Sequence, residues 1–186
     1  GKSIVCRIFR CLDVPVYNAD ERARWLTTHD PEIKQELVEL LGEEAYLADG
    51  TYNRPYVASR VFTDETLLNR LNQIVHPRVR RDTAQWHLRH GGALYVIREA
   101  ALMNRAGDNN NLDYVVVVTA PLDLRIARIK SRDSRSEAEI RAIVERQISD
   151  EARLGLADFV VDNDTHSRLI PQVIRLHELF IQKKKD

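Results

Sequence analysis

The chain begins with Gly1-Lys2-Ser3, and an amphipathic helical pattern follows directly. These residues match the end of the phosphate-binding motif G-x-x-x-x-G-K-[ST], whose backbone N–H groups cradle phosphates at the start of a helix. In that motif the lysine reaches the β- and γ-phosphates and the serine hydroxyl binds Mg²⁺. The motif also includes a buried strand and a glycine-rich loop, so we expect that strand and most of the loop to precede Gly1. Because the tripeptide alone is common, the alternative is a sequence scar before an ordinary helix.

The composition limits the kinds of partner that the protein can have. Its 186 residues suit one α/β domain with inserted helices. The 28 basic side chains balance the 28 acidic ones, so no general attraction to nucleic acid or anionic membranes exists. No apolar run approaches the roughly 20 residues that span a bilayer. We expect a cytoplasmic monomer or weak homo-oligomer with no nucleic-acid or membrane partner, in which Cys6 and Cys11 are reduced thiols.

Strand and helix patterns alternate along the chain, as they do in α/β folds with a parallel sheet. The expected strands cover 14–17, 93–97, 114–119 and 159–162. The expected helices cover 2–11, 20–28, 31–41, 54–90, 122–132, 136–148 and 167–182. The long run is interrupted at Thr63-Asp64 and again at His76-Pro77. Because residues 54–90 contain no strand pattern, we expect a helical insertion over one end of the sheet.

Two carboxylates follow expected strands, where ligands bind in parallel sheets. Asp20 follows the first strand and could accept the proton of a substrate hydroxyl or hold that hydroxyl in line with a phosphate. The alternative is a helix N-cap. Glu99 follows the second strand and is suited to hold Mg²⁺ through a water. The alternative is an exposed charge at a strand end.

Cations and a histidine supply further candidates. Arg125, Arg128 and Arg132 share one face of an expected helix, where they could stabilise the charge of a transferring phosphoryl group. The alternative is a solvated basic face, although the break and capped helix after them favour a mobile lid. His76 lies at a joint between two expected helices, where a structural role is the more common one.

Six segments carry a family resemblance through their order and spacing. They are Gly1-Lys2-Ser3, 14–24 (VPVYNADERAR), Asp49-Gly50-Thr51 with Arg54 and Val61-Phe62, 71–77 (LNQIVHP), Arg132-Asp133 with Gln147, and 157–163 (ADFVVDN). Together they resemble the dephospho-coenzyme A kinase family over the whole chain. The resemblance implies transfer of the ATP γ-phosphate to the 3′-hydroxyl of dephospho-coenzyme A, with ATP and dephospho-coenzyme A as substrates and Mg²⁺ as the metal.

The resemblance also implies a fold. It predicts a P-loop NTPase of three αβα layers with a five-stranded parallel sheet, a helical substrate domain and a lid. The expected core covers about 1–20, 92–121 and 157–186 in a single kinase domain. The helical insertion that receives coenzyme A covers about 21–91, and the lid covers about 122–156.

The resemblance assigns roles to ten residues. The nucleotide is expected at Gly1, Lys2, Ser3, Arg132 and Asn163, of which Asn163 falls near the adenine. The metal is expected at Ser3 and Glu99, and the acceptor at Asp20, Arg54, His76 and Glu99. Catalysis is expected to use Asp20, Lys2, Arg132 and Arg128, with Asp20 as base or orienting group.

Several positions depart from the family pattern. Asn18 stands where the family has aspartate, Ile4 replaces a threonine, and Arg125 replaces a glutamine. In the segment after Glu99, Asn104 and Arg105 replace a phenylalanine and a glutamate. Two alternatives follow: a P-loop kinase of another small acceptor, such as a nucleoside monophosphate, or a nucleotide-binding protein without transferase activity.

Overall fold

The computed structural model describes residues 1–62, 64–100, 106–107, 110–132, 136–145 and 148–183. The chain divides into two compact units, of which the first combines Gly1–Val14 with Ala101–Asp186 and the second comprises Pro15–Ala100. Four positions or segments that the sequence singled out lie outside the described residues: Thr63, 101–105, Asp133 and Gln147.

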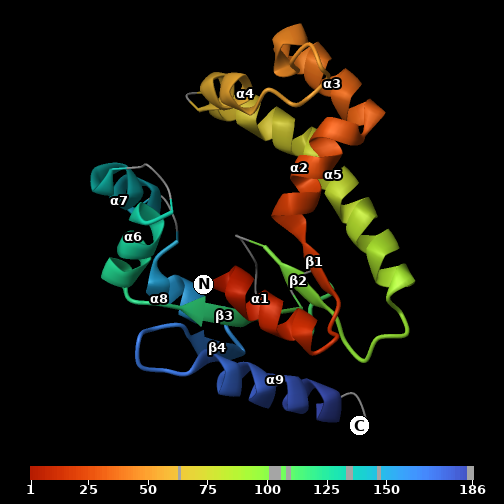
Figure 1. Ribbon diagram of the computed structural model, residues 1–186. Helices are drawn as coiled ribbons and strands as arrows, with labels where there is room; N and C mark the ends of the chain where they lie inside the picture. Colours follow the sequence, from red (N-terminus) through yellow and green to blue (C-terminus); the bar gives the residue numbers. More distant parts are fainter. Residues whose placement is uncertain (63, 101–105, 108–109, 133–135, 146–147, 184–186) are drawn as a thin grey trace. The chain divides into compact units, whose positions relative to one another are not determined.

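The first unit is a parallel strand pair with helices packed on it (Figure 1). Its elements are α1 (Lys2–Cys11), β3 (Val116–Thr119), α6 (Leu122–Lys130), α7 (Glu137–Glu145), α8 (Asp150–Leu154), β4 (Phe159–Asp162) and α9 (Leu169–Lys183). β3 pairs in parallel with β4, α9 packs on α1 and β4, and α6 packs on α7. Phe9, Val161 and Val173 are almost completely buried.

The second unit is a parallel strand pair with a helical subdomain (Figure 1). Its elements are β1 (Val16–Asn18), α2 (Ala19–His29), α3 (Pro31–Leu41), the 3₁₀ turn η1 (Glu43–Ala45), α4 (Arg54–Val61), α5 (Glu65–Arg89) and β2 (Ile97–Glu99). β1 and β2 pair in parallel, and α2, α3 and α4 all pack on α5. The helical core contains Leu26, Ile33, Leu37, Leu41, Ala45, Tyr46 and Val57.

Local sequence signals account for the bounds of α3. Asp30 caps its start by accepting hydrogen bonds from the backbone N–H groups of Glu32 and Ile33, both at 3.0 Å. Pro31 occupies the first turn, where its missing N–H costs nothing. The helix ends at Gly42, whose φ of 93° favours glycine. Buried residues at steps of four form the stripe that faces the core.

Most expected elements are confirmed. All four strands are present, although β2 begins at Ile97, later than the sequence pattern indicates. The capping box also forms, because the Ser136 N–H donates to the Glu139 carboxylate and the Glu139 N–H donates to the Ser136 hydroxyl. No helix among the residues that the structure describes is both long enough and apolar enough to cross a bilayer.

The expected interruption at His76-Pro77 is wrong. Both residues lie inside α5, which continues from Glu65 to Arg89. Proline removes one helical hydrogen bond and pushes on the carbonyl groups of the preceding turn. α5 nevertheless packs on α2, α3 and α4. Tertiary packing therefore outweighs the local cost of the proline.

We predict that Asp30→Ala lowers the free energy of unfolding by about 1 kcal/mol, because two N–H groups at the start of α3 lose their acceptor. Asp30→Asn is the matched control, since asparagine caps helices equally well. Urea denaturation followed by circular dichroism measures both variants. Equal stability of Asp30→Ala and wild type would show that the cap contributes nothing.

Candidate active site

Asn18 at the end of β1, Asp20 in the following helix and Glu99 at the end of β2 all lie in the second unit. The strand register pairs Asn18 with Glu99 directly. The Asn18 side-chain oxygen accepts the backbone N–H of Glu21 at 3.1 Å, and its nitrogen donates to a Glu99 carboxylate oxygen at 3.4 Å. α2 begins at the next residue, so Asp20 lies in its first turn. Asp20 is exposed, whereas Glu99 is only 9% exposed.

A charged network ties these strand ends to α5. Asp82 on α5 accepts the Tyr17 hydroxyl at 2.7 Å. It also accepts two hydrogen bonds from the Arg22 guanidinium, at 2.9 and 2.7 Å. The Trp86 ring packs on the Tyr17 ring with centroids 5.4 Å apart. Asp82, from a distant part of the chain, therefore holds both Tyr17, which precedes Asn18, and Arg22, which follows Asp20.

Burial and hydrogen bonding shift the pKa values in this network. Burial is the main cause that raises the pKa of Tyr17 to about 12. The hydrogen bonds from Arg22 lower the pKa of Asp82, with a smaller contribution from the Tyr17 hydroxyl. Asp82 is thus ionised and Tyr17 is protonated at neutral pH. Sequence reasoning missed this network, because no local pattern links residues sixty or more positions apart.

In the first unit, Gly1 caps α1 without a side-chain acceptor, and the described first turn of that helix contains no acidic residue. Lys2 and Ser3 lie exposed in this turn. A Cβ atom added to Gly1 would lie 2.3 Å from the Asn163 side-chain nitrogen and 3.2 Å from Val118. Any residue other than glycine at position 1 would therefore require the side chains of Asn163 and Val118 to move. A helix start of this kind favours an anion.

Asn163 follows β4 and is only 6% exposed. Its backbone N–H donates to the Thr119 carbonyl at 2.9 Å, and its own carbonyl accepts the Arg128 guanidinium at 2.9 Å. Among the described residues, its side-chain nitrogen has no hydrogen-bond partner. A buried N–H donor without a partner lowers the free energy of unfolding by about 1–3 kcal/mol, unless another group supplies an acceptor.

The three arginines near α6 have different surroundings. Arg125 forms an ion pair with Asp150, and Arg128 holds the Asn163 carbonyl. Arg132 lies beyond the end of α6, where its backbone N–H donates to the Ile129 carbonyl at 3.0 Å. The helix therefore ends two residues before the predicted position, and Arg132 does not continue the helical face that carries Arg125 and Arg128.

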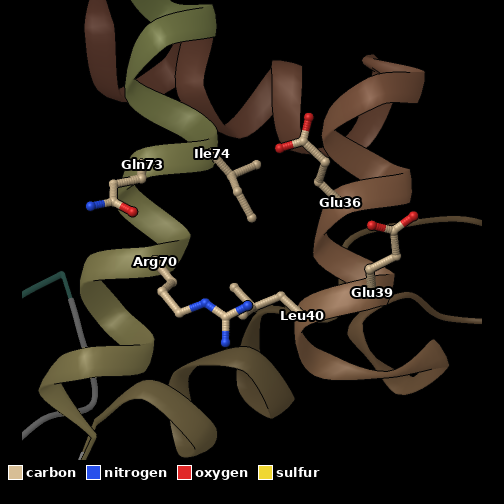
Figure 2. A pocket seen from close by; sticks show the side chains of 6 residues that line it. All are labelled: Glu36, Glu39, Leu40, Arg70, Gln73 and Ile74. Carbon is tan, nitrogen blue, oxygen red and sulfur yellow. The ribbon is translucent and has the colours of Figure 1, made fainter.

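The two remaining candidates lie on the helical subdomain. Arg54 is the first residue of α4, and His76 lies within α5, with both side chains exposed. A separate open hollow of about 340 Å³ lies between α3 and α5. Figure 2 shows its lining, formed by Glu36, Glu39, Leu40, Arg70, Gln73 and Ile74. It contains none of the candidate residues that the sequence singled out.

We predict that Asp82→Asn destabilises the protein by about 2 kcal/mol, because Arg22 keeps a partly buried charge without its carboxylate. Tyr17→Phe removes the hydroxyl that donates to Asp82 but leaves the Arg22–Asp82 ion pair, and it is expected to cost about 1 kcal/mol. Since the folded pKa of Asp82 is lowered, its stabilisation is present above the unfolded pKa of about 4 and is lost as the pH falls through the folded pKa.

Urea denaturation at a series of pH values measures these effects. The stability difference between wild type and Asp82→Asn is expected to be constant near neutral pH and to shrink below about pH 4. A difference that stays the same in acid would contradict the assigned ion pair.

Comparisons with known proteins show the family of this chain. A family model described as dephospho-CoA kinase matches residues 1–168. A dephospho-CoA kinase of Bacteroides fragilis is 36% identical over 184 residues, covering 98% of this chain and 89% of the relative. A dephospho-CoA kinase of Porphyromonas gingivalis is 36% identical over 188 residues, covering 99% and 91%.

Solved structures show the same fold. A Thermus thermophilus protein superposes with a TM-score of 0.80 at 27% identity, covering 98% of this chain and 91% of that one. A dephospho-CoA kinase from Campylobacter jejuni superposes with a TM-score of 0.70 at 21% identity, covering 98% and 92%, which supports the fold alone. From the family model and the close relatives together, this chain belongs to the dephospho-CoA kinase family.

Proposed function

We propose that this protein transfers the γ-phosphoryl group of ATP to the 3′-hydroxyl of dephospho-coenzyme A, which forms coenzyme A. Membership of the dephospho-CoA kinase family supports the reaction. The observation that supports the site is the pairing of β1 with β2, whose register sets Asn18 opposite the buried Glu99, with the exposed Asp20 two residues after Asn18. Phosphoryl transfer needs a group that orients the acceptor hydroxyl and a group that helps to hold a metal ion. We propose Asp20 for the first role and Glu99 for the second.

The nucleotide site that we propose uses residues of the first unit. Gly1, Lys2 and Ser3 bind the phosphates, since the start of α1 has a close-packed glycine and no acidic group in its described first turn. The buried Asn163 nitrogen lacks a partner among the described residues and fits an acceptor atom of the nucleotide. Arg132 and Arg128 are proposed to offset charge on the phosphates. Arg128 can do so only if it leaves the Asn163 carbonyl or shares its guanidinium.

The donor types present fit Mg²⁺, which prefers oxygen ligands and substrate phosphates. We propose that the Ser3 hydroxyl binds it directly and that Glu99 holds it through water. When bound, the ion would neutralise negative charge on the phosphates. Among the described residues, no three His, Cys, Asp or Glu side chains gather as a metal site by themselves.

Asp20 is the proposed catalytic residue. Its carboxylate is exposed in the first turn of α2, so a substrate can reach it. It accepts a hydrogen bond from the 3′-hydroxyl, keeps that oxygen in line with the γ-phosphate, and takes the proton as the new bond forms. Arg54 and His76, both exposed on the helical subdomain, are proposed to contact the rest of the acceptor.

The finer description of the fold is also a proposal. The resemblance supports the proposal of a five-stranded parallel sheet, and each of the two strand pairs among the described residues is parallel. The division proposed from the sequence assigns about 21–91 to the helical substrate part and about 122–156 to the lid. Closure of such a lid would exclude water and so protect ATP from hydrolysis.

We predict that Asp20→Asn lowers turnover by about 10²–10⁴-fold while the dissociation constant for ATP stays nearly unchanged. The substitution removes the proton acceptor but leaves the residues proposed to bind the phosphates. Glu21→Gln is the matched control, because it neutralises the neighbouring exposed carboxylate in the same helical turn. Near-wild-type turnover of Asp20→Asn would remove Asp20 from the mechanism.

We predict that ADP release with ATP and Mg²⁺ requires dephospho-coenzyme A and is matched by the appearance of coenzyme A. An analogue without the 3′-hydroxyl is expected to give no ADP, and AMP is the test of a nucleoside monophosphate kinase. Chromatographic measurement of both products separates the candidates. ATP binding without ADP release for any acceptor would favour a nucleotide-binding protein without transferase activity.

A further inference from the structure

We propose that Asn18 is a positioning residue, whose single amide holds Glu99 and the start of α2 in one fixed arrangement. The importance of that arrangement for catalysis rests on the proposed function of Asp20 and Glu99. The arrangement itself rests on the contacts of Asn18 within the second unit. The family resemblance implies an aspartate at this position, so the amide is one of the departures noted from the sequence.

The two ends of the amide have different tasks. The side-chain oxygen accepts the Glu21 N–H at 3.1 Å and so caps α2. The side-chain nitrogen donates to a Glu99 carboxylate oxygen at 3.4 Å across the paired strands. Both tasks are compatible only with a side chain that has an acceptor and a donor at this length. Asn18 therefore links the helix that carries Asp20 to the carboxylate at the end of β2.

Serine and aspartate also cap helices well, but neither would donate a hydrogen bond to Glu99 as Asn18 does. Serine would cap α2, but its hydroxyl is too short to reach Glu99 as the amide does. Aspartate would also cap α2, but it has no donor when ionised and would bring a negative charge against Glu99. Two carboxylates in such contact repel each other. A divalent cation near them would reduce this repulsion.

With asparagine at position 18, an amide faces the Glu99 carboxylate. With aspartate at that position, two carboxylates would face each other. The amide donates a long hydrogen bond, at 3.4 Å, to the Glu99 carboxylate, and this contact needs no cation. Glu99 and the start of α2 are therefore arranged before any metal or nucleotide binds. Asn18→Asp is expected to make this arrangement depend on a divalent cation, whereas Asn18→Ser removes the contact without adding charge.

Thermal unfolding of the nucleotide-free full chain tests the pairing without any activity. In EDTA, Asn18→Asp is expected to melt a few degrees below Asn18→Ser, and Mg²⁺ or Mn²⁺ is expected to remove most of that difference. Wild type and Asn18→Ser are expected to respond little to the same ions. Adding Glu99→Gln to Asn18→Asp is expected to abolish the metal response. Equal melting of the Asp and Ser variants in EDTA would overturn the pairing.

Steady-state kinetics test the positioning. Asn18→Ser is expected to lower kcat by about 10-fold with little change in either KM, because the reacting groups lose their fixed geometry. If Asn18 acted only as a helix cap, Asn18→Ser would keep the wild-type kcat, because serine also caps α2. A wild-type kcat for Asn18→Ser would therefore overturn the positioning role. If wild type itself shows no ADP release that depends on dephospho-coenzyme A, the proposed function fails while the melting experiment still decides the pairing.

Discussion

The parallel pairing of β1 with β2 is the constraint on which the candidate active site depends. Its register sets Asn18 opposite Glu99, and α2 starts with no intervening loop. A slip of one residue would turn Glu99 to the other face of the strand pair, since successive side chains of a strand alternate. The exposed Asp20 and the buried Glu99 therefore depend on the same few backbone hydrogen bonds.

That pairing is supported from outside the strands. Tyr17 and Arg22, which lie on either side of Asn18 and Asp20, both bind Asp82 on α5. α5 in turn packs on α2, α3 and α4 around a core that contains Ile33 and Leu37. The segment that carries the proposed catalytic carboxylate of Asp20 is thus held by a helix from a distant part of the sequence. This agrees with the general need to hold reacting groups by packed and hydrogen-bonded neighbours.

Elements with local signals could be predicted from the sequence, and contacts over long distances could not. The start of α3 follows from Asp30-Pro31, and the start of α7 follows from the Ser136 capping box, because both signals act within one turn. Pro77 misled the local interpretation, since the packing of α5 outweighs the cost of one proline. Asp82 has no sequence signal of its own, because its partners on β1 and α2 are brought to it only by folding.

The candidate site shows the same division. Asp20 and Glu99 could be singled out because both follow strand patterns; in the structure Asp20 lies in the helix after β1, whereas Glu99 is the last residue of β2 and is paired with Asn18. Asn18 could be recognised as a departure from the family, but its contact with Glu99 depends on a strand register that the sequence does not reveal. Likewise, the sequence predicts that Arg128 offsets charge on a phosphate, whereas its contact with the Asn163 carbonyl is revealed only by the fold.

A crystal structure of the protein with dephospho-coenzyme A, Mg²⁺ and a non-hydrolysable ATP analogue tests the central claim most directly. The distance from the ribose 3′-oxygen to the Asp20 carboxylate is the deciding quantity. We expect that distance to be about 2.6–3.2 Å, with the 3′-oxygen directed at the γ-phosphate. A bound acceptor whose 3′-oxygen lies far from Asp20, with another carboxylate in contact with it, would contradict the site described here.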